Sequence, residues 1–212
     1  MKLRLKKYID LIPLKTTVVV GFILAGLITV VSSFKKEEHY TSATTFYLNN
    51  DSITSVQAFQ KVYTVLMSPR CMNCHPAGDR PLQGDDSHVH IMNVQRGKDG
   101  KGLYALKCSN CHQPQNTPGL HTPPGNPKWQ LPPADMKMVF QGRSAHDLAL
   151  QIMDYNQNGH KNKEQLLEHA RDTLVKAAWN MGEGRKPPPL AYSDFVKAWD
   201  TWIEKGAYAP AK

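Results

Sequence analysis

The sequence predicts a mostly α-helical domain with long proline-rich loops, preceded by one N-terminal transmembrane helix. Residues 17–31 contain no charged side chain and only two glycines, which is typical of a membrane-spanning segment. Val56, Phe59, Tyr63 and Leu66 recur at helical spacing and so share one face of a helix. Residues 114–133 contain seven prolines, which exclude a helix there and indicate a stiff loop.

The same patterns divide the chain into four parts. We expect a cytoplasmic basic tail at 1–15, a transmembrane signal anchor at 16–34, a polar tether at 35–52 and a folded domain at 53–212. Within the domain, almost no sheet is expected. Helices are predicted at residues 54–67, 101–112, 144–155, 163–180 and 193–205.

The basic tail sets the orientation of the predicted anchor. Five basic residues and one acidic residue occupy positions 1–15, so by the positive-inside rule this end stays in the cytoplasm. The expected location is the cytoplasmic membrane, with a single pass and the C-terminal domain in the periplasm. A cleaved signal peptide is the alternative, although VVSSF offers a poor cleavage site and the apolar run exceeds a usual signal core. Both interpretations export the domain.

The formal charge of +8 does not indicate a nucleic-acid partner. Half of the excess belongs to the basic tail, and no basic cluster interleaved with aromatic residues appears in the rest of the chain. Nucleic-acid binding is therefore excluded as the main function.

All four cysteines belong to two copies of one pentapeptide pattern, CMNCH and CSNCH. C-x-x-C-H is the attachment sequence of c-type haem. The two thiols add to two vinyl groups on one porphyrin edge, so they must lie one turn apart, and the following histidine becomes an axial ligand of the iron. The expected cofactors are two covalently bound haem c groups. The residues that would hold them are Cys71, Cys74 and His75 for the first and Cys108, Cys111 and His112 for the second.

Two alternatives use the same cysteines. A zinc ribbon usually spaces its cysteine pairs by 15–20 residues, whereas 33 residues separate Cys74 from Cys108, and zinc does not need a histidine after each pair. Disulfides between the motifs would leave both histidines unexplained. Export favours haem, because covalent attachment of haem takes place outside the bacterial cytoplasm.

The chain resembles the c-type cytochromes, with a helix leading into C-x-x-C-H and a closing aromatic helix. The segments CMNCHPAGDRPLQGDDSHVHIMNVQRG, CSNCH, PPGNPKWQLPPADM, LLEHARDTLVKAAWNMGEGR and WIEKGA are similar to a family of small, membrane-anchored bacterial dihaem cytochromes. Some members are associated with molybdenum hydroxylases of the isoquinoline 1-oxidoreductase type. The similarity covers roughly residues 53–210 and implies a cytochrome c-like dihaem domain.

The short distance between the motifs predicts one compact dihaem unit. Only 36 residues lie between Cys71 and Cys108, which is too few for a complete first cytochrome domain. The first haem must therefore be enclosed partly by residues from elsewhere in the chain, and the two macrocycles should supply much of the apolar core.

The sequence does not decide which residues are the sixth ligands of the two irons. Met136 follows the proline-rich LPPAD and is the candidate for the iron bound by His112, with Met138 as the fallback. His90 is favoured over His88 in the SHVHIM segment, and His169 lies on a predicted apolar helical face. A methionine is more often core filling, and a buried histidine is often simply a core residue.

Electron transfer is the expected function, with no catalytic residues and with the haems as a relay at the outer face of the membrane. Redox proteins are the expected partners: a membrane quinol-oxidising or periplasmic dehydrogenase and a terminal acceptor. The alternative is a peroxidase-like dihaem enzyme with one five-coordinate haem. It would need an acid/base pair beside an open iron, and Glu164, Glu168 and Asp172 read better as the solvated side of a helix.

Overall fold

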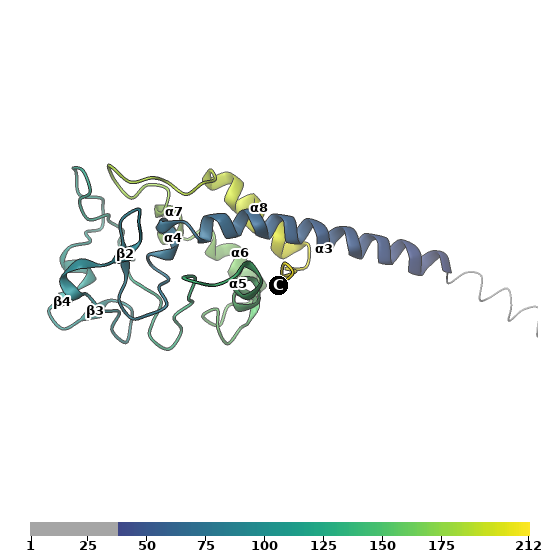
Figure 1. The fold of residues 1–212 in the computed structure, drawn as a ribbon, viewed down its shortest axis with the longest axis horizontal. Helices are drawn as coiled ribbons and strands as arrows, with labels where there is room; N and C mark the ends of the chain where they lie inside the picture. Colours follow the sequence, from purple (N-terminus) through teal and green to yellow (C-terminus); the bar gives the residue numbers. More distant parts are fainter. Residues whose placement is uncertain (1–37) are drawn as a thin grey trace, which may run out of the picture. The chain divides into compact units, whose positions relative to one another are not determined.

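The computed structural model describes residues 38–212, and the regular structure is mostly helical with few strands (Figure 1). The chain divides at Asn50 into two units, and the site lies in Asp51–Lys212. The helices are α3 (Glu38–Leu66), α4 (Pro69–Met72), η1 (Ile91–Asn93), η2 (Cys108–Asn110), α5 (Ala145–Met153), α6 (Lys163–His169), α7 (Thr173–Ala177) and α8 (Tyr192–Glu204). The strands are β1 (Leu82–Gln83), β2 (His88–Val89), β3 (Gly102–Leu103) and β4 (Leu106–Lys107).

No helix among residues 38–212 is long and apolar enough to cross a membrane. The predicted anchor at 16–34 lies outside the described residues. Helix α3 already begins at Glu38, within the range predicted as a tether, and it ends at Leu66, close to the predicted end.

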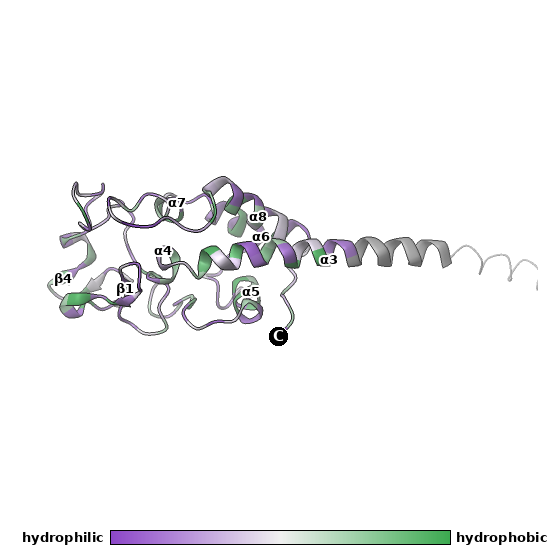
Figure 2. Ribbon diagram, turned by 45° about the horizontal axis from the view of Figure 1, so that its top comes forward, coloured by the Kyte–Doolittle hydropathy of each residue, from purple (hydrophilic) through white to green (hydrophobic). Residues whose placement is uncertain are grey.

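The hydrophobic core forms where α3 meets the closing helix α8. Phe59 and Trp202 are fully buried, and their ring centroids lie 4.5 Å apart. The buried Ser55 hydroxyl donates to the Trp202 carbonyl oxygen at 2.9 Å and accepts from the Tyr208 amide at 3.0 Å. Figure 2 shows hydrophobic and hydrophilic residues interleaved along both helices, as expected when each helix buries one face.

Helices α5 and α6 complete this core. Leu148 and Ile152 of α5 are buried, and the Trp199 indole of α8 donates to the Leu166 carbonyl oxygen of α6 at 2.9 Å. Ser144 caps α5, and Asn162 forms a capping box with Gln165 at the start of α6. The predicted helices at 144–155 and 193–205 are therefore confirmed to within two residues.

The single helix predicted at 163–180 is wrong, because the segment breaks into α6 and α7. Asp172 accepts a hydrogen bond from the Leu174 amide at 2.8 Å and so begins a new helix after the turn at Ala170–Asp172. An aspartate is a strong helix N-cap, and here the local capping interaction interrupts the apolar periodicity.

The helix predicted at 101–112 is also wrong. A hairpin of antiparallel β3 and β4 occupies residues 102–107, with Gly102 opposite Lys107 and Leu103 opposite Leu106, and only η2 is helical. Gly100 and Gly102 adopt φ of +79° and +92°, which α-helices of L-residues do not contain. Gly100 also approaches the proline-rich loop so closely that a Cβ atom would lie 2.0 Å from the Leu131 carbonyl oxygen.

Residues 73–144 otherwise form loops around two hairpins. The first hairpin pairs β1 with β2, with Leu82 opposite Val89 and Gln83 opposite His88. The proline-rich segment 114–133 contains no helix, as predicted. These loops carry the second motif and most residues of the cavity described next.

Candidate functional site

Both pentapeptides fold into tight helical turns. In the first, the Cys74 amide donates to the Cys71 carbonyl oxygen at 3.2 Å, and the His75 amide donates to that of Met72 at 2.9 Å. In the second, the amides of Cys111 and His112 both donate to the Cys108 carbonyl oxygen, at 3.2 and 2.9 Å. The two cysteines of each motif thus lie one turn apart, which is the spacing that attachment to one porphyrin edge requires.

The imidazole of His75 is held at one of its two nitrogens. Its Nδ1 atom lies 2.7 Å from the Met138 carbonyl oxygen. A carbonyl oxygen can only accept, so Nδ1 carries the proton and Nε2 keeps a free lone pair. The ring also stacks on Phe140, with centroids 3.8 Å apart and planes inclined by 9°.

His112 repeats this arrangement with different partners. Its Nδ1 atom lies 2.7 Å from the Pro124 carbonyl oxygen, and its ring stacks on Trp129 with centroids 4.2 Å apart and a 9° inclination. A hydrogen bond from Nδ1 to a carbonyl is the usual device that fixes the tautomer and orientation of a metal-bound histidine. Two unrelated loop segments therefore hold both motif histidines through Nδ1 and leave the lone pair on Nε2.

Burial keeps both imidazoles neutral. It lowers the pKa of His75 to about 4, with a smaller contribution from the neighbouring His169, and it also lowers the pKa of His112. A neutral imidazole is the form that binds iron. Burial likewise raises the pKa of Cys71 to about 12 and that of Cys74 to about 11. No disulfide joins any of the four cysteines.

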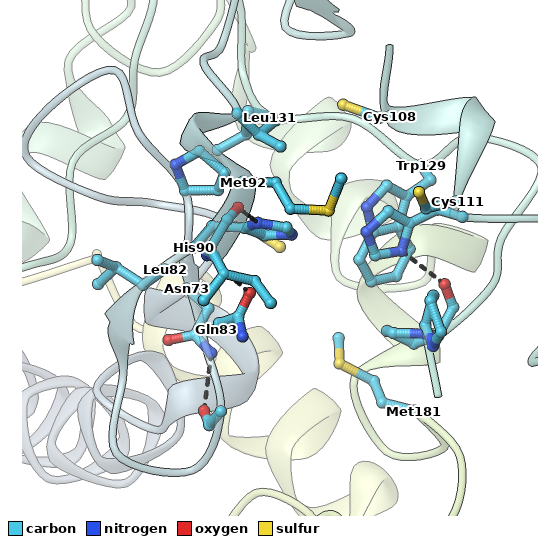
Figure 3. A pocket seen from close by; sticks show the side chains of 18 of the residues that line it. Asn73, Leu82, Gln83, His90, Met92, Cys108, Cys111, Trp129, Leu131 and Met181 are labelled. Carbon is cyan, nitrogen blue, oxygen red and sulfur yellow. Dashed lines mark hydrogen bonds between the residues drawn. The ribbon is translucent and has the colours of Figure 1, made fainter. Parts of the chain in front are cut away.

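One cavity of about 510 Å³ is lined by residues of both motifs (Figure 3). It falls within the usual size range of ligand pockets. Motif residues in its lining are Cys74, Cys108, Cys111 and His112. Much of the rest is apolar, including Leu82, Ile91, Val94, Leu106 and Leu131.

Two arginines give the cavity a basic side. Arg70 and Arg185 both line it, and the positive charge of Arg70 contributes to lowering the pKa of Arg185, after burial. The Arg70 side chain is 4% exposed, pairs with Asp85 at 2.5 Å, and leaves its Nε atom without a partner among the described residues. An apolar cavity with cationic groups in its lining suits a flat hydrophobic ligand that carries carboxylates, as haem does.

The predicted sixth ligands fall in different places. His90 lines the cavity, and its ring centroid lies 6.4 Å from that of His112. His88 also lines the cavity but is exposed and bonded to Asp86 at 2.6 Å. His169, whose pKa burial lowers, lies close enough to affect the pKa of His75.

Neither of the two candidate methionines lines the cavity that contains His112. Met138 packs against the hydrophobic core near His75, and its sulfur lies 3.8 Å from Gln151 Nε2. Met136 lies beside Gly159 and is not among the residues of the cavity. The proline-rich loop instead supplies Pro124 and Trp129 to His112.

Sequence reasoning missed several residues that surround the motifs. Met92 and Met181 line the cavity, as do Arg70 and Trp129. Arg70 directly precedes the first motif, a position that could have marked it, whereas nothing in the sequence singled out Trp129 or Met181.

Within residues 38–212, no group of three or more His, Cys, Asp or Glu side chains converges to hold a metal ion. Haem needs fewer protein donors, because the porphyrin supplies four of the iron ligands.

The chain matches no protein-family model, no curated protein and no solved structure at a significant level.

Proposed function

We propose that this protein is an electron-transfer c-type cytochrome with two covalently bound haem c groups. The single observation that carries the proposal is that the two motif histidines make the same two kinds of contact. Each donates from Nδ1 to a backbone carbonyl oxygen at 2.7 Å and each stacks on an aromatic ring, which leaves Nε2 free in both. Two such histidines, each following a pair of thiols one turn apart, fit two haem groups.

The haem would supply reversible one-electron chemistry of iron, and the chain's own residues would determine how it is used. His75 and His112 hold the proximal positions, and Cys71, Cys74, Cys108 and Cys111 provide the thioether links. Cys108 also lies close enough to Cys74 to raise its pKa, so the two attachment sites are neighbours. A short separation between cofactors favours a relay over two independent carriers.

Redox proteins are the partners that this proposal implies: a membrane quinol-oxidising or periplasmic dehydrogenase as donor, and a terminal acceptor. We place the relay at the outer face of the cytoplasmic membrane, held by the predicted anchor at 16–34. The peroxidase-like alternative needs an open iron. The position of His90 opposite His112 does not favour it at the second motif.

The test is haem counting in a host that matures c-type cytochromes. Mass spectrometry should show the mass of two haems on the wild-type chain, and the pyridine haemochrome spectrum should be that of thioether-linked haem. Cys71→Ala with Cys74→Ala should leave one haem. Cys108→Ala with Cys111→Ala is the matched control and should leave the other. A wild-type chain without added haem mass would refute the proposal, and rapid turnover of peroxide by the purified protein would favour the enzyme.

A further inference from the structure

We propose that His90, which follows the first motif, is the sixth ligand of the iron bound by His112 in the second motif. The inference rests on the proposed function, because it assumes that haem occupies the second site. It assigns a cross-site role to a loop residue and replaces the expectation that Met136 serves this iron.

The spacing of the two rings is the first argument. An imidazole ring with bonds of about 1.33 Å or slightly more has its nitrogens about 1.15 Å from its centre. Metal–imidazole bonds are about 2.0–2.1 Å. Two imidazoles on opposite sides of one metal therefore have centroids about 6.3–6.5 Å apart. The centroids of the His90 and His112 rings lie 6.4 Å apart, and the ring planes are inclined by 61°.

The proton positions are the second argument. The Nδ1 atom of His90 lies 2.6 Å from the Ile91 carbonyl oxygen, just as that of His112 bonds to Pro124. Both Nε2 atoms therefore carry lone pairs. Two lone pairs cannot form a hydrogen bond with each other, but both can bind one cation placed between them.

The backbone around His90 is fixed on the first site's loop. The His90 amide donates to the Pro81 carbonyl oxygen at 2.9 Å, and the Ile91 amide donates to Gln83 Oε1 at 3.2 Å. The Leu82 amide in turn donates to the Asn73 carbonyl oxygen of the first motif at 3.0 Å. The β1–β2 hairpin thus links the backbone of His90 to the first motif, while the His90 ring lies beside His112 of the second motif.

Neighbouring residues fit this role less well. His88 is exposed, and its Nδ1 atom is bonded to Asp86. Among residues 38–212, the ring that contacts His112 from this hairpin is that of His90 and not that of His88. Met92 and Met181 line the same cavity and are the methionine competitors. A methionine ligand would leave a distinct spectroscopic signature, so the competitors can be tested directly.

The experiment uses the full-length dihaem protein in detergent. Low-temperature electron paramagnetic resonance should show two low-spin haems in the wild type, without a methionine–iron band in the red part of the oxidised spectrum for the second haem. His90→Ala should keep two haems by mass but convert half of the low-spin signal to high spin. Added imidazole should restore that half. His160→Ala, at an exposed histidine that does not line the cavity, is the matched control and should keep both low-spin signals.

Several outcomes would overturn the inference. Retention of both low-spin signals in His90→Ala without imidazole would remove His90 from the iron. In protein that carries only the second haem, a methionine–iron band could disappear in Met92→Ala, Met181→Ala or Met136→Ala. That result would assign the sixth ligand to the methionine that was replaced. Fewer than two haems on the wild type would instead refute the proposed function, so the two failures are distinguishable.

Discussion

Gly125 offers a sharp test of how the second motif histidine is held. It follows Pro124, whose carbonyl oxygen accepts from His112 Nδ1 at 2.7 Å. A Cβ atom on Gly125 would lie 2.0 Å from the carbonyl oxygen of Gln115, 2.1 Å from its carbonyl carbon and 2.6 Å from the Gln113 carbonyl oxygen. All three are backbone atoms, so Gly125→Ala must push the two chain segments apart by about 1.4 Å or more to reach ordinary contact distance.

The magnitude follows from the interactions that this shift disturbs. The Gly125 amide donates to Asn116 Oδ1 at 2.8 Å, and the neighbouring Pro124 carbonyl oxygen holds His112. Each hydrogen bond contributes about 0.5–1.5 kcal/mol net, and overpacking costs about 1–3 kcal/mol. We expect a loss of about 3 kcal/mol in the free energy of unfolding, and a shift of one of the two midpoint potentials as His112 loses its Nδ1 partner.

Guanidinium unfolding followed by the Soret band measures the first effect, and a spectroscopic redox titration measures the second. The unfolding midpoint should fall by about 0.5–1 M. Gly78→Ala is the matched control, because a Cβ atom there meets nothing within 4 Å. Equal midpoints and unchanged potentials in the two variants would refute the account of how His112 is positioned.

Two further predictions concern the first motif. His169→Ala should leave two haems by mass but turn the low-spin signal of the haem at His75 to high spin, as measured by electron paramagnetic resonance, whereas an unchanged signal would assign His169 to the core alone. Asp79→Asn should destabilise the protein by a constant amount above pH about 4 and by progressively less at lower pH, measured by unfolding at pH 3–7. Lys137 and then Arg96 hold the pKa of Asp79 below its usual range, so its stabilisation is present above the unfolded-state pKa and is lost on acidification; a difference that stays constant down to pH 3 would contradict this.

Local sequence patterns predicted the helices that depend on residues close to one another in the sequence. The apolar spacing of α8 predicted a helix within one residue of its observed bounds, and that of α3 predicted where the helix ends. The predicted helix at 101–112 failed, because the close approach of Gly100 to Leu131, 31 residues away, favours a hairpin. The pattern of apolar residues alone could not show that contact.

In the site, too, the residues set by local sequence could be predicted and their long-range partners could not. The pentapeptides identified the thiols and proximal histidines, because attachment chemistry fixes their spacing within five residues. The partners of these histidines could not be predicted, since the Met138 carbonyl oxygen lies 63 residues from His75 and is a backbone atom without a sequence signature. Met136 was favoured for its proline-rich context, but that context supplies Pro124 and Trp129 to His112 while Met136 lies beside Gly159.

The burial of the first pair of thiols has a consequence for the order of biogenesis. In the folded domain Cys71 and Cys74 are half-buried, and desolvation raises their pKa values to about 12 and about 11, whereas Cys111 is exposed. A maturation enzyme must reach both thiols of a motif at once. For a protein of the proposed kind, loading of the first motif therefore has to precede closure of the chain around it, and premature folding would trap a species with haem at the second motif only.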